Sequence, residues 1–131
     1  MKNIIYSIYI DNQETNLNDK HLHTKNQLKK HYDRLVEVKK QYAKNCNAEF
    51  RIYGNDTFYQ KFKNKFQGFE FDLINLYKIH VWEQLGKDYE NVLYLDLDVI
   101  PNTTENFFET FDMNKICVYA PNATKENVWT N

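Results

Sequence analysis

Hydrophobic residues along the chain fall into short runs that are separated by amphipathic stretches. The first run spans residues 4–10 and ends at Asp11, and a second, alternating run spans residues 49–53. Both are rich in β-branched and aromatic residues, which is typical of strands. A third run, residues 92–100, is interrupted only by two carboxylates. Such a run predicts a central strand covered on both faces. A last strand is expected at residues 116–120.

Two of the stretches between these runs repeat their apolar residues at helical spacing. One is expected to run from Thr24 to Asn45, with Thr24 and Gln27 forming a capping box at its start. The other follows Asp56, whose side chain suits the N-cap position. The apolar positions of this second helix lie on one face: Phe58, Tyr59, Phe62 and Phe66.

A third helix is predicted over residues 73–85. Asp72 is expected to cap it, and Gly86 suits the left-handed residue at which many helices end. Its apolar residues lie almost all round the cylinder, which predicts a helix buried on every side. A short helix or turn is expected at residues 105–111.

Strands that alternate with helices favour an α/β fold with a mostly parallel central sheet flanked by helices. The 131 residues fit a single domain that spans residues 1–131. Ligands of such sheets bind beyond the carboxyl ends of the strands. Asp11, Asp96 and Asp98 fall at that edge.

Charge and composition exclude several classes of partner. The net charge of -1, from 17 basic and 18 acidic residues, gives no bulk attraction for nucleic acid. The basic run Lys29, Lys30, Lys39 and Lys40 is interpreted as a solvated helix face. No stretch approaches the roughly 20 apolar residues of a membrane span. With no signal-peptide core and with Cys46 and Cys117 far apart, we expect a cytoplasmic protein with reduced thiols.

The candidate chemistry lies at Asp96 and Asp98. Side chains alternate along a strand, so the two carboxylates are expected on one face and Leu97 on the other. Two neighbouring carboxylates repel each other and lose hydration, and a divalent cation with oxygen ligands, Mg²⁺ or Mn²⁺, removes both costs. The alternative is that Asp98 caps the following turn while Asp96 meets a Lys or Arg.

Two segments resemble a known family. Lys78-Ile79-His80-Val81-Trp82, followed by Tyr94-Leu95-Asp96-Leu97-Asp98, is similar to the glycogenin-like branch of the retaining glycosyltransferases with a GT-A fold. Asn106-Phe107-Phe108-Glu109 resembles the segment that follows the metal motif there. The resemblance implies a Rossmann-like GT-A nucleotide-sugar-binding domain. Its C-terminal part would be missing, because the family's third metal ligand is a downstream His and no His follows Asp98.

Carried over residue by residue, the resemblance implies that Asp96 and Asp98 ligate Mn²⁺ (or Mg²⁺). Lys78 would approach the donor sugar or diphosphate, with a snorkelling helix residue as the alternative. His80 and Trp82 are interpreted as core packing, and no catalytic group is identified. The residues implied to bind the donor are Lys78, Asp96, Tyr9 and Asp11.

The sequence therefore predicts a metal-dependent glycosyltransferase that moves a sugar from a nucleotide-diphospho-sugar, a UDP-sugar above all, to an unknown acceptor. One alternative is a non-catalytic nucleotide-sugar-binding or scaffold domain. Another is a phosphatase of the haloacid dehalogenase type, whose Asp-x-Asp usually lies near the start of the chain. That motif continues with Thr or Val two residues after the second Asp, where this chain has Ile100.

Overall fold

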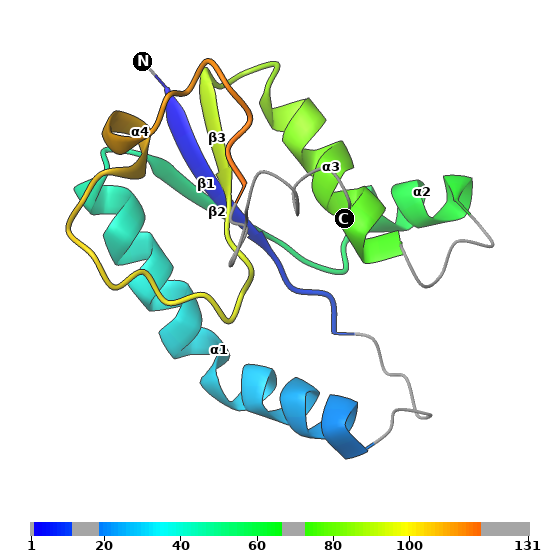
Figure 1. Ribbon diagram of the computed structural model, residues 1–131. Coiled ribbons are helices and arrows are strands. Elements are labelled where there is room, and N and C mark those ends of the chain that lie inside the picture. The colour runs from blue at the N-terminus through cyan, green and yellow to red at the C-terminus, as the bar shows by residue number, and fades with distance from the viewer. Residues whose placement is uncertain (1, 12–18, 67–72, 119–131) are drawn as a thin grey trace, which may run out of the picture.

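The computed structural model describes residues 2–11, 19–66 and 73–118. These residues form an α/β arrangement in which helices flank a small sheet (Figure 1). In chain order the elements are β1 (Asn3–Ile8), α1 (Asp19–Asn45), β2 (Glu49–Tyr53), α2 (Thr57–Lys65), α3 (Leu73–Leu85), β3 (Asn91–Tyr94) and α4 (Phe107–Thr110).

The sheet has the order β2-β1-β3, and both strand pairs are parallel. This confirms the predicted parallel α/β architecture. Ile4 of β1 pairs with Glu49 on one side and with Val92 on the other. The prediction of a central strand at residues 92–100 was wrong, because β3 is a half-buried edge strand of the described sheet and ends at Tyr94. The central position belongs to β1, which is buried from Ile4 to Ile8.

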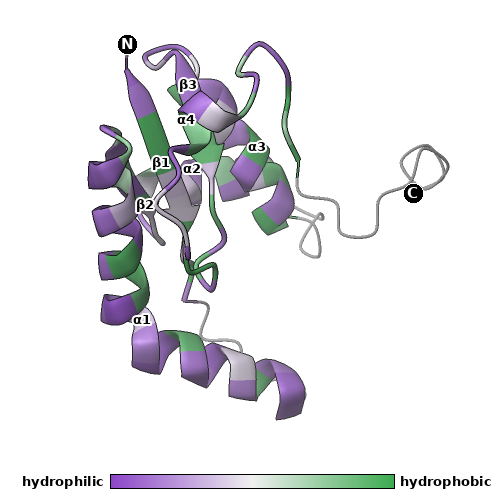
Figure 2. Cartoon of the chain, turned by 60° about the vertical axis from the view of Figure 1, so that its left-hand side comes forward, coloured by the Kyte–Doolittle hydropathy of each residue, from purple (hydrophilic) through white to green (hydrophobic). Residues whose placement is uncertain are grey.

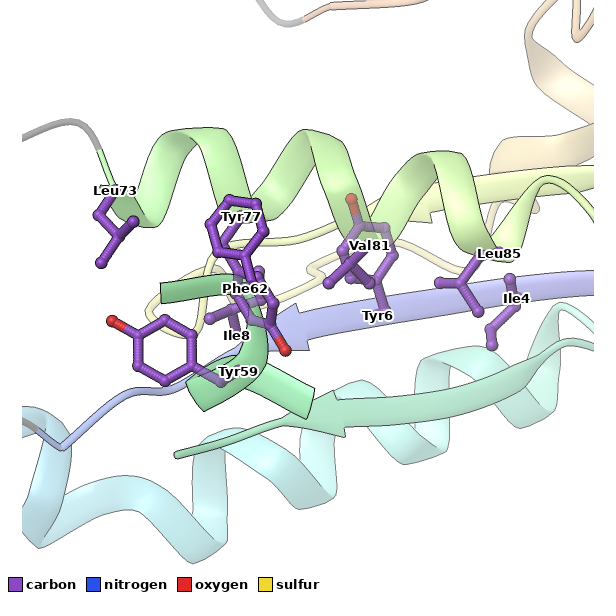
Figure 3. Packing of buried hydrophobic residues seen from close by; sticks show 9 residues of the cluster. All are labelled: Ile4, Tyr6, Ile8, Tyr59, Phe62, Leu73, Tyr77, Val81 and Leu85. Atoms are coloured by element: carbon purple, nitrogen blue, oxygen red, sulfur yellow. The ribbon is translucent and has the colours of Figure 1, made fainter. Parts of the chain in front are cut away.

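Alternate side chains of β1 enter two separate cores. Tyr6 faces α2 and α3, while Ile5 faces α1 and α4. Figure 3 shows the larger core, in which α3 lies across β1 and α2 closes one end. Burying each large apolar side chain stabilises the fold by roughly 1.5–3 kcal/mol. This core consists of Ile4, Tyr6, Ile8, Tyr59, Phe62, Leu73, Tyr77, Val81 and Leu85.

The α3 helix buries one face only. Leu73, Tyr77, Val81 and Leu85 follow one another at four-residue spacing and face β1 (Figure 3). In contrast, Ile79 is 60% exposed, so the prediction of burial on every side was wrong. The reason is that, among the described residues, the sheet and α2 contact α3 from one side.

The end of α3 differs from its prediction. Gly86 does not adopt the left-handed conformation that was predicted at the end of α3. Such a residue instead follows α1, where Asn47 has a φ of 50°. There the Ala48 amide donates to the Ala43 carbonyl at 2.8 Å, and the chain turns into β2. The predicted cap Asp72 lies outside the described residues.

The α1 helix begins at Asp19, five residues before the predicted start. The Thr24 hydroxyl donates to the Lys20 carbonyl at 3.1 Å within the helix, so the predicted capping box at Thr24 was wrong. Its amino-terminal half extends away from the sheet and is largely hydrophilic (Figure 2). The buried residues of α1, from Val36 to Ala43, all lie in its second half.

Of the remaining predictions about elements, two were confirmed and one was wrong. The Asp56 carboxylate accepts from the Tyr59 amide at 2.9 Å, which confirms the N-cap of α2. The short helix near residues 105–111 is confirmed as α4. The last strand was wrong where it can be compared, because residues 116–118 are not in a strand and Ile116 is 75% exposed. Residues 119 and 120 lie outside the described residues.

No helix in the described part of the chain is long and apolar enough to cross a membrane.

Candidate functional site

The acidic pair lies on a turn just beyond the carboxyl end of β3. The Leu95 amide donates to the Tyr6 carbonyl at 3.0 Å, and the Ser7 hydroxyl donates to the Leu95 carbonyl at 2.6 Å. After this point the chain leaves the sheet, and the Val99 amide donates to the Asp96 carbonyl at 3.0 Å across a turn. The predicted strand therefore ends before its two carboxylates, which the turn carries at the edge of the sheet. We call residues 96–98 the acidic turn.

Burial within the acidic turn follows the predicted alternation. Leu97 is 5% exposed, whereas Asp96 and Asp98 are both exposed. The apolar side chain anchors the turn to the body of the domain, and the two carboxylates face solvent. Asp98 has no hydrogen bond or ion pair with any residue that the structure describes.

Asp96 is held by Lys78 and Tyr94. Its carboxylate accepts from the Lys78 ammonium at 3.0 Å and from the Tyr94 hydroxyl at 2.6 Å. Burial pushes the pKa of Asp96 upward, but the hydrogen bonds from Tyr94 and Lys78 and the charge of Lys78 outweigh it, so this pKa is lowered. Lys78 and Asp96 keep 27% and 54% of their side chains exposed. The contact matches the alternative interpretation, in which Asp96 meets a lysine.

A second lysine reaches the acidic turn, and the sequence interpretation missed it. Lys39 is 0% exposed, so its assignment to a solvated face was wrong. Its ammonium donates to the Leu35 carbonyl at 3.2 Å and to the Leu97 carbonyl. Burial lowers the pKa of Lys39, and the negative charge of Asp98 partly opposes this. Helical spacing carried the signal, because Lys39 lies three residues after buried Val36 and three before buried Tyr42.

Tyr9 and Asp11 follow the carboxyl end of β1. Because β1 and β3 are adjacent and parallel, their carboxyl ends meet at the same edge of the sheet (Figure 1). The Tyr9 ring packs on Tyr32 with 5.0 Å between ring centroids, and Asp11 forms an ion pair with Lys25 at 3.6 Å. The Tyr9 hydroxyl is buried and has no hydrogen-bond partner among the described residues. A buried hydroxyl without a partner is unfavourable.

The two remaining residues of the α3 motif differ. His80 stacks on Phe58 and Phe62, with centroid separations of 5.4 and 4.9 Å, which confirms its interpretation as a packing residue. Trp82 is 40% exposed, so its interpretation as core packing was wrong.

The two carboxylates of the acidic turn are oxygen ligands of the kind that a divalent cation takes. Within residues 2–11, 19–66 and 73–118, no group of three or more His, Cys, Asp or Glu side chains is placed to hold a metal ion. Mg²⁺ characteristically takes only one or two protein carboxylates and completes its shell with phosphates and water. Two exposed carboxylates on an anchored turn suit that mode.

Both cysteines are free thiols. Cys46 is buried and Cys117 is exposed.

The parallel sheet with helices on both faces and polar residues at its carboxyl edge defines an α/β domain of the Rossmann-like GT-A kind. A family model, Glycosyl transferase family 8, matches residues 2–131, and the chain belongs to this family. Membership supports glycosyltransferase activity in general. No curated protein and no solved structure matches the chain significantly.

Proposed function

We propose that this domain binds a nucleotide-diphospho-sugar through a divalent cation at the acidic turn and takes part in transfer of the sugar to an acceptor. The observation that carries the proposal is the pair of exposed carboxylates, Asp96 and Asp98, on a turn fixed at the carboxyl edge of a parallel sheet. This is the edge at which open α/β sheets bind ligands. Membership in family 8 supports the same class of reaction.

Asp96 and Asp98 would hold Mn²⁺ or Mg²⁺ together with the donor diphosphate. When bound, the cation supplies positive charge that stabilises the diphosphate as it leaves. The lowered pKa of Asp96 keeps its carboxylate ionised near neutral pH, as a metal ligand must be. Exposure of both carboxylates leaves room for phosphate oxygens to complete the shell.

Lys78 would serve as the counter-ion of Asp96 before the donor binds. Its ammonium lies 3.0 Å from the Asp96 carboxylate, and half-exposed ion pairs of this kind exchange partners at little cost. Once released from Asp96, the Lys78 ammonium would be available to the diphosphate or donor sugar. The Lys78 ammonium also lies over the Tyr94 ring, 5.0 Å from its centroid. This cation–π contact would remain after the ammonium leaves Asp96.

Tyr9 and Asp11 would contact the nucleoside part of the donor. Both residues follow β1, whose neighbour β3 leads into the acidic turn. Donor base and diphosphate would then lie along a single edge of the sheet.

The test is a calorimetric titration of UDP with Mn²⁺ and again with EDTA. We expect binding only with Mn²⁺, and Asp98→Asn should weaken it at least about 100-fold, because a cation loses one of its two protein ligands. Asp112→Asn is the matched control, since the Asp112 carboxylate is exposed, like that of Asp98, and is not a proposed metal ligand. Equal binding with EDTA, or no loss in Asp98→Asn, would refute the metal site.

The same preparation separates the two alternatives. A scaffold domain would show no UDP binding, or binding indifferent to Mn²⁺. A phosphatase of the haloacid dehalogenase type would release phosphate from a simple phosphoester with no need for a nucleotide sugar, and Asp96→Asn would abolish the release. Either result would replace the proposed function.

A further inference from the structure

Lys39 is the one charged side chain in the described part of the chain that is fully buried. Removing an ammonium from water costs several kcal/mol unless hydrogen bonds replace its hydration. Here two carbonyls do so, Leu35 within α1 and Leu97 across the domain. The first lies within its own helix, four residues back. The second joins α1 to the acidic turn, 58 residues later in the chain.

The bond to Leu97 falls at the centre of the acidic turn. Its acceptor is the carbonyl of the peptide that links Leu97 to Asp98, and a planar peptide held at its oxygen has little freedom to rotate. The Leu97 side chain is buried on the same anchored side. The Ser7 hydroxyl donates to the carbonyl of Leu95, the residue just before the acidic turn. The turn is thus tied to both β1 and α1.

We propose that Lys39 is a positioning residue for the acidic turn. By holding the Leu97 carbonyl, it sets the separation and direction of the Asp96 and Asp98 carboxylates, the two groups that would hold a divalent cation. This inference rests on the proposed function. It adds to that function a residue in a different helix, on the opposite face of the sheet from Lys78.

The sign of its effect on metal affinity separates positioning from charge. A fixed ammonium near two carboxylates repels a cation, so a lysine that acted through charge alone would weaken Mn²⁺ binding. Removing that charge would then raise the affinity. A lysine that fixes the ligands does the reverse, and groups that orient metal ligands are typically worth 10–100-fold in affinity. Only positioning predicts a loss when the ammonium is removed.

The experiment uses Lys39→Met, which keeps an unbranched apolar side chain and removes the ammonium, with Lys39→Gln as a second variant. Lys40→Met is the matched control, because Lys40 is the next residue and is exposed. Mn²⁺ affinity is measured by calorimetry with UDP present, well below each unfolding midpoint. Amide exchange at Val99, whose bond to Asp96 closes the turn, is followed without metal.

We expect Lys39→Met and Lys39→Gln to lose at least about tenfold in Mn²⁺ affinity and to exchange the Val99 amide faster. Lys40→Met should match the wild type in both. Unchanged or tighter Mn²⁺ binding in the Lys39 variants would overturn the inference and leave the proposed function intact. Failure of the wild type itself to bind Mn²⁺ would overturn the proposed function. If neither variant folds, Lys39 serves the fold and the positioning role is rejected.

Discussion

Two lysines reach the acidic turn from opposite faces of the sheet, and the structure holds them differently. Lys78 comes from α3, keeps 27% of its side chain exposed and meets the Asp96 carboxylate. Lys39 comes from α1, is 0% exposed and meets the Leu97 carbonyl. The first bonds to a charged side chain that can exchange partners. The second bonds to a backbone carbonyl, which is fixed by the chain and cannot exchange partners.

The difference shows how one small turn combines exchange with rigidity. A half-exposed ion pair contributes little to stability, so releasing Lys78 from Asp96 costs little. A buried ammonium that loses its acceptor pays the full cost of an unsatisfied charge, so Lys39 stays in place. The carboxylates can therefore exchange their counter-ion for a metal while the backbone beneath them keeps its shape.

The largest expected difference between the two lysines is in stability. Lys39→Ala should lower the free energy of unfolding by about 2–4 kcal/mol, because it leaves a cavity and an unpartnered Leu97 carbonyl. Lys78→Ala should cost less than about 1 kcal/mol, as for other half-exposed pairs. Urea denaturation of both variants measures this. Equal losses would end the distinction between a fixed and an exchangeable lysine.

A smaller effect is expected on the metal itself. Lys78→Met removes the ammonium that competes for Asp96, so Mn²⁺ alone should bind a few-fold more tightly. UDP affinity in the presence of Mn²⁺ should fall, because the diphosphate loses a cation partner. Lys115→Met is a control, since Lys115 also pairs with an aspartate, Asp112, which is not a proposed donor or metal ligand. Weaker Mn²⁺ binding in Lys78→Met would show that this lysine supports the metal site instead of competing for it.

The positions of most helices and strands could be predicted from the sequence. Hydrophobic runs located β1 and β2, and helical spacing with the Asp56 cap located α2. These features depend on neighbours in the chain, which is why they can be read locally. The edge position of β3 could not be read in this way. A run as apolar as residues 92–100 suits a central strand, but pairing partners are set by residues far away in the sequence.

The candidate site was predicted only in part, because some of its contacts also join residues that are far apart in the sequence. The positions of Asp96 and Asp98 at the carboxyl edge followed from the strand pattern, whereas their metal-binding role stays a prediction. Lys39 was missed because a lysine within a basic run is normally solvated. Its burial follows from contact with a turn 58 residues away, which periodicity alone could only hint at. Exposure of Ile79 and Trp82 likewise depends on what packs against α3, not on α3 itself.

The central claim is that the acidic turn holds a divalent cation, and electron paramagnetic resonance of Mn²⁺ tests it most directly. Titrating Mn²⁺ into the wild-type chain should show one bound ion per chain, and the double substitution Asp96→Asn with Asp98→Asn should leave the ion free in solution. A wild type that leaves Mn²⁺ free, or a double variant that binds it as tightly, would contradict the account.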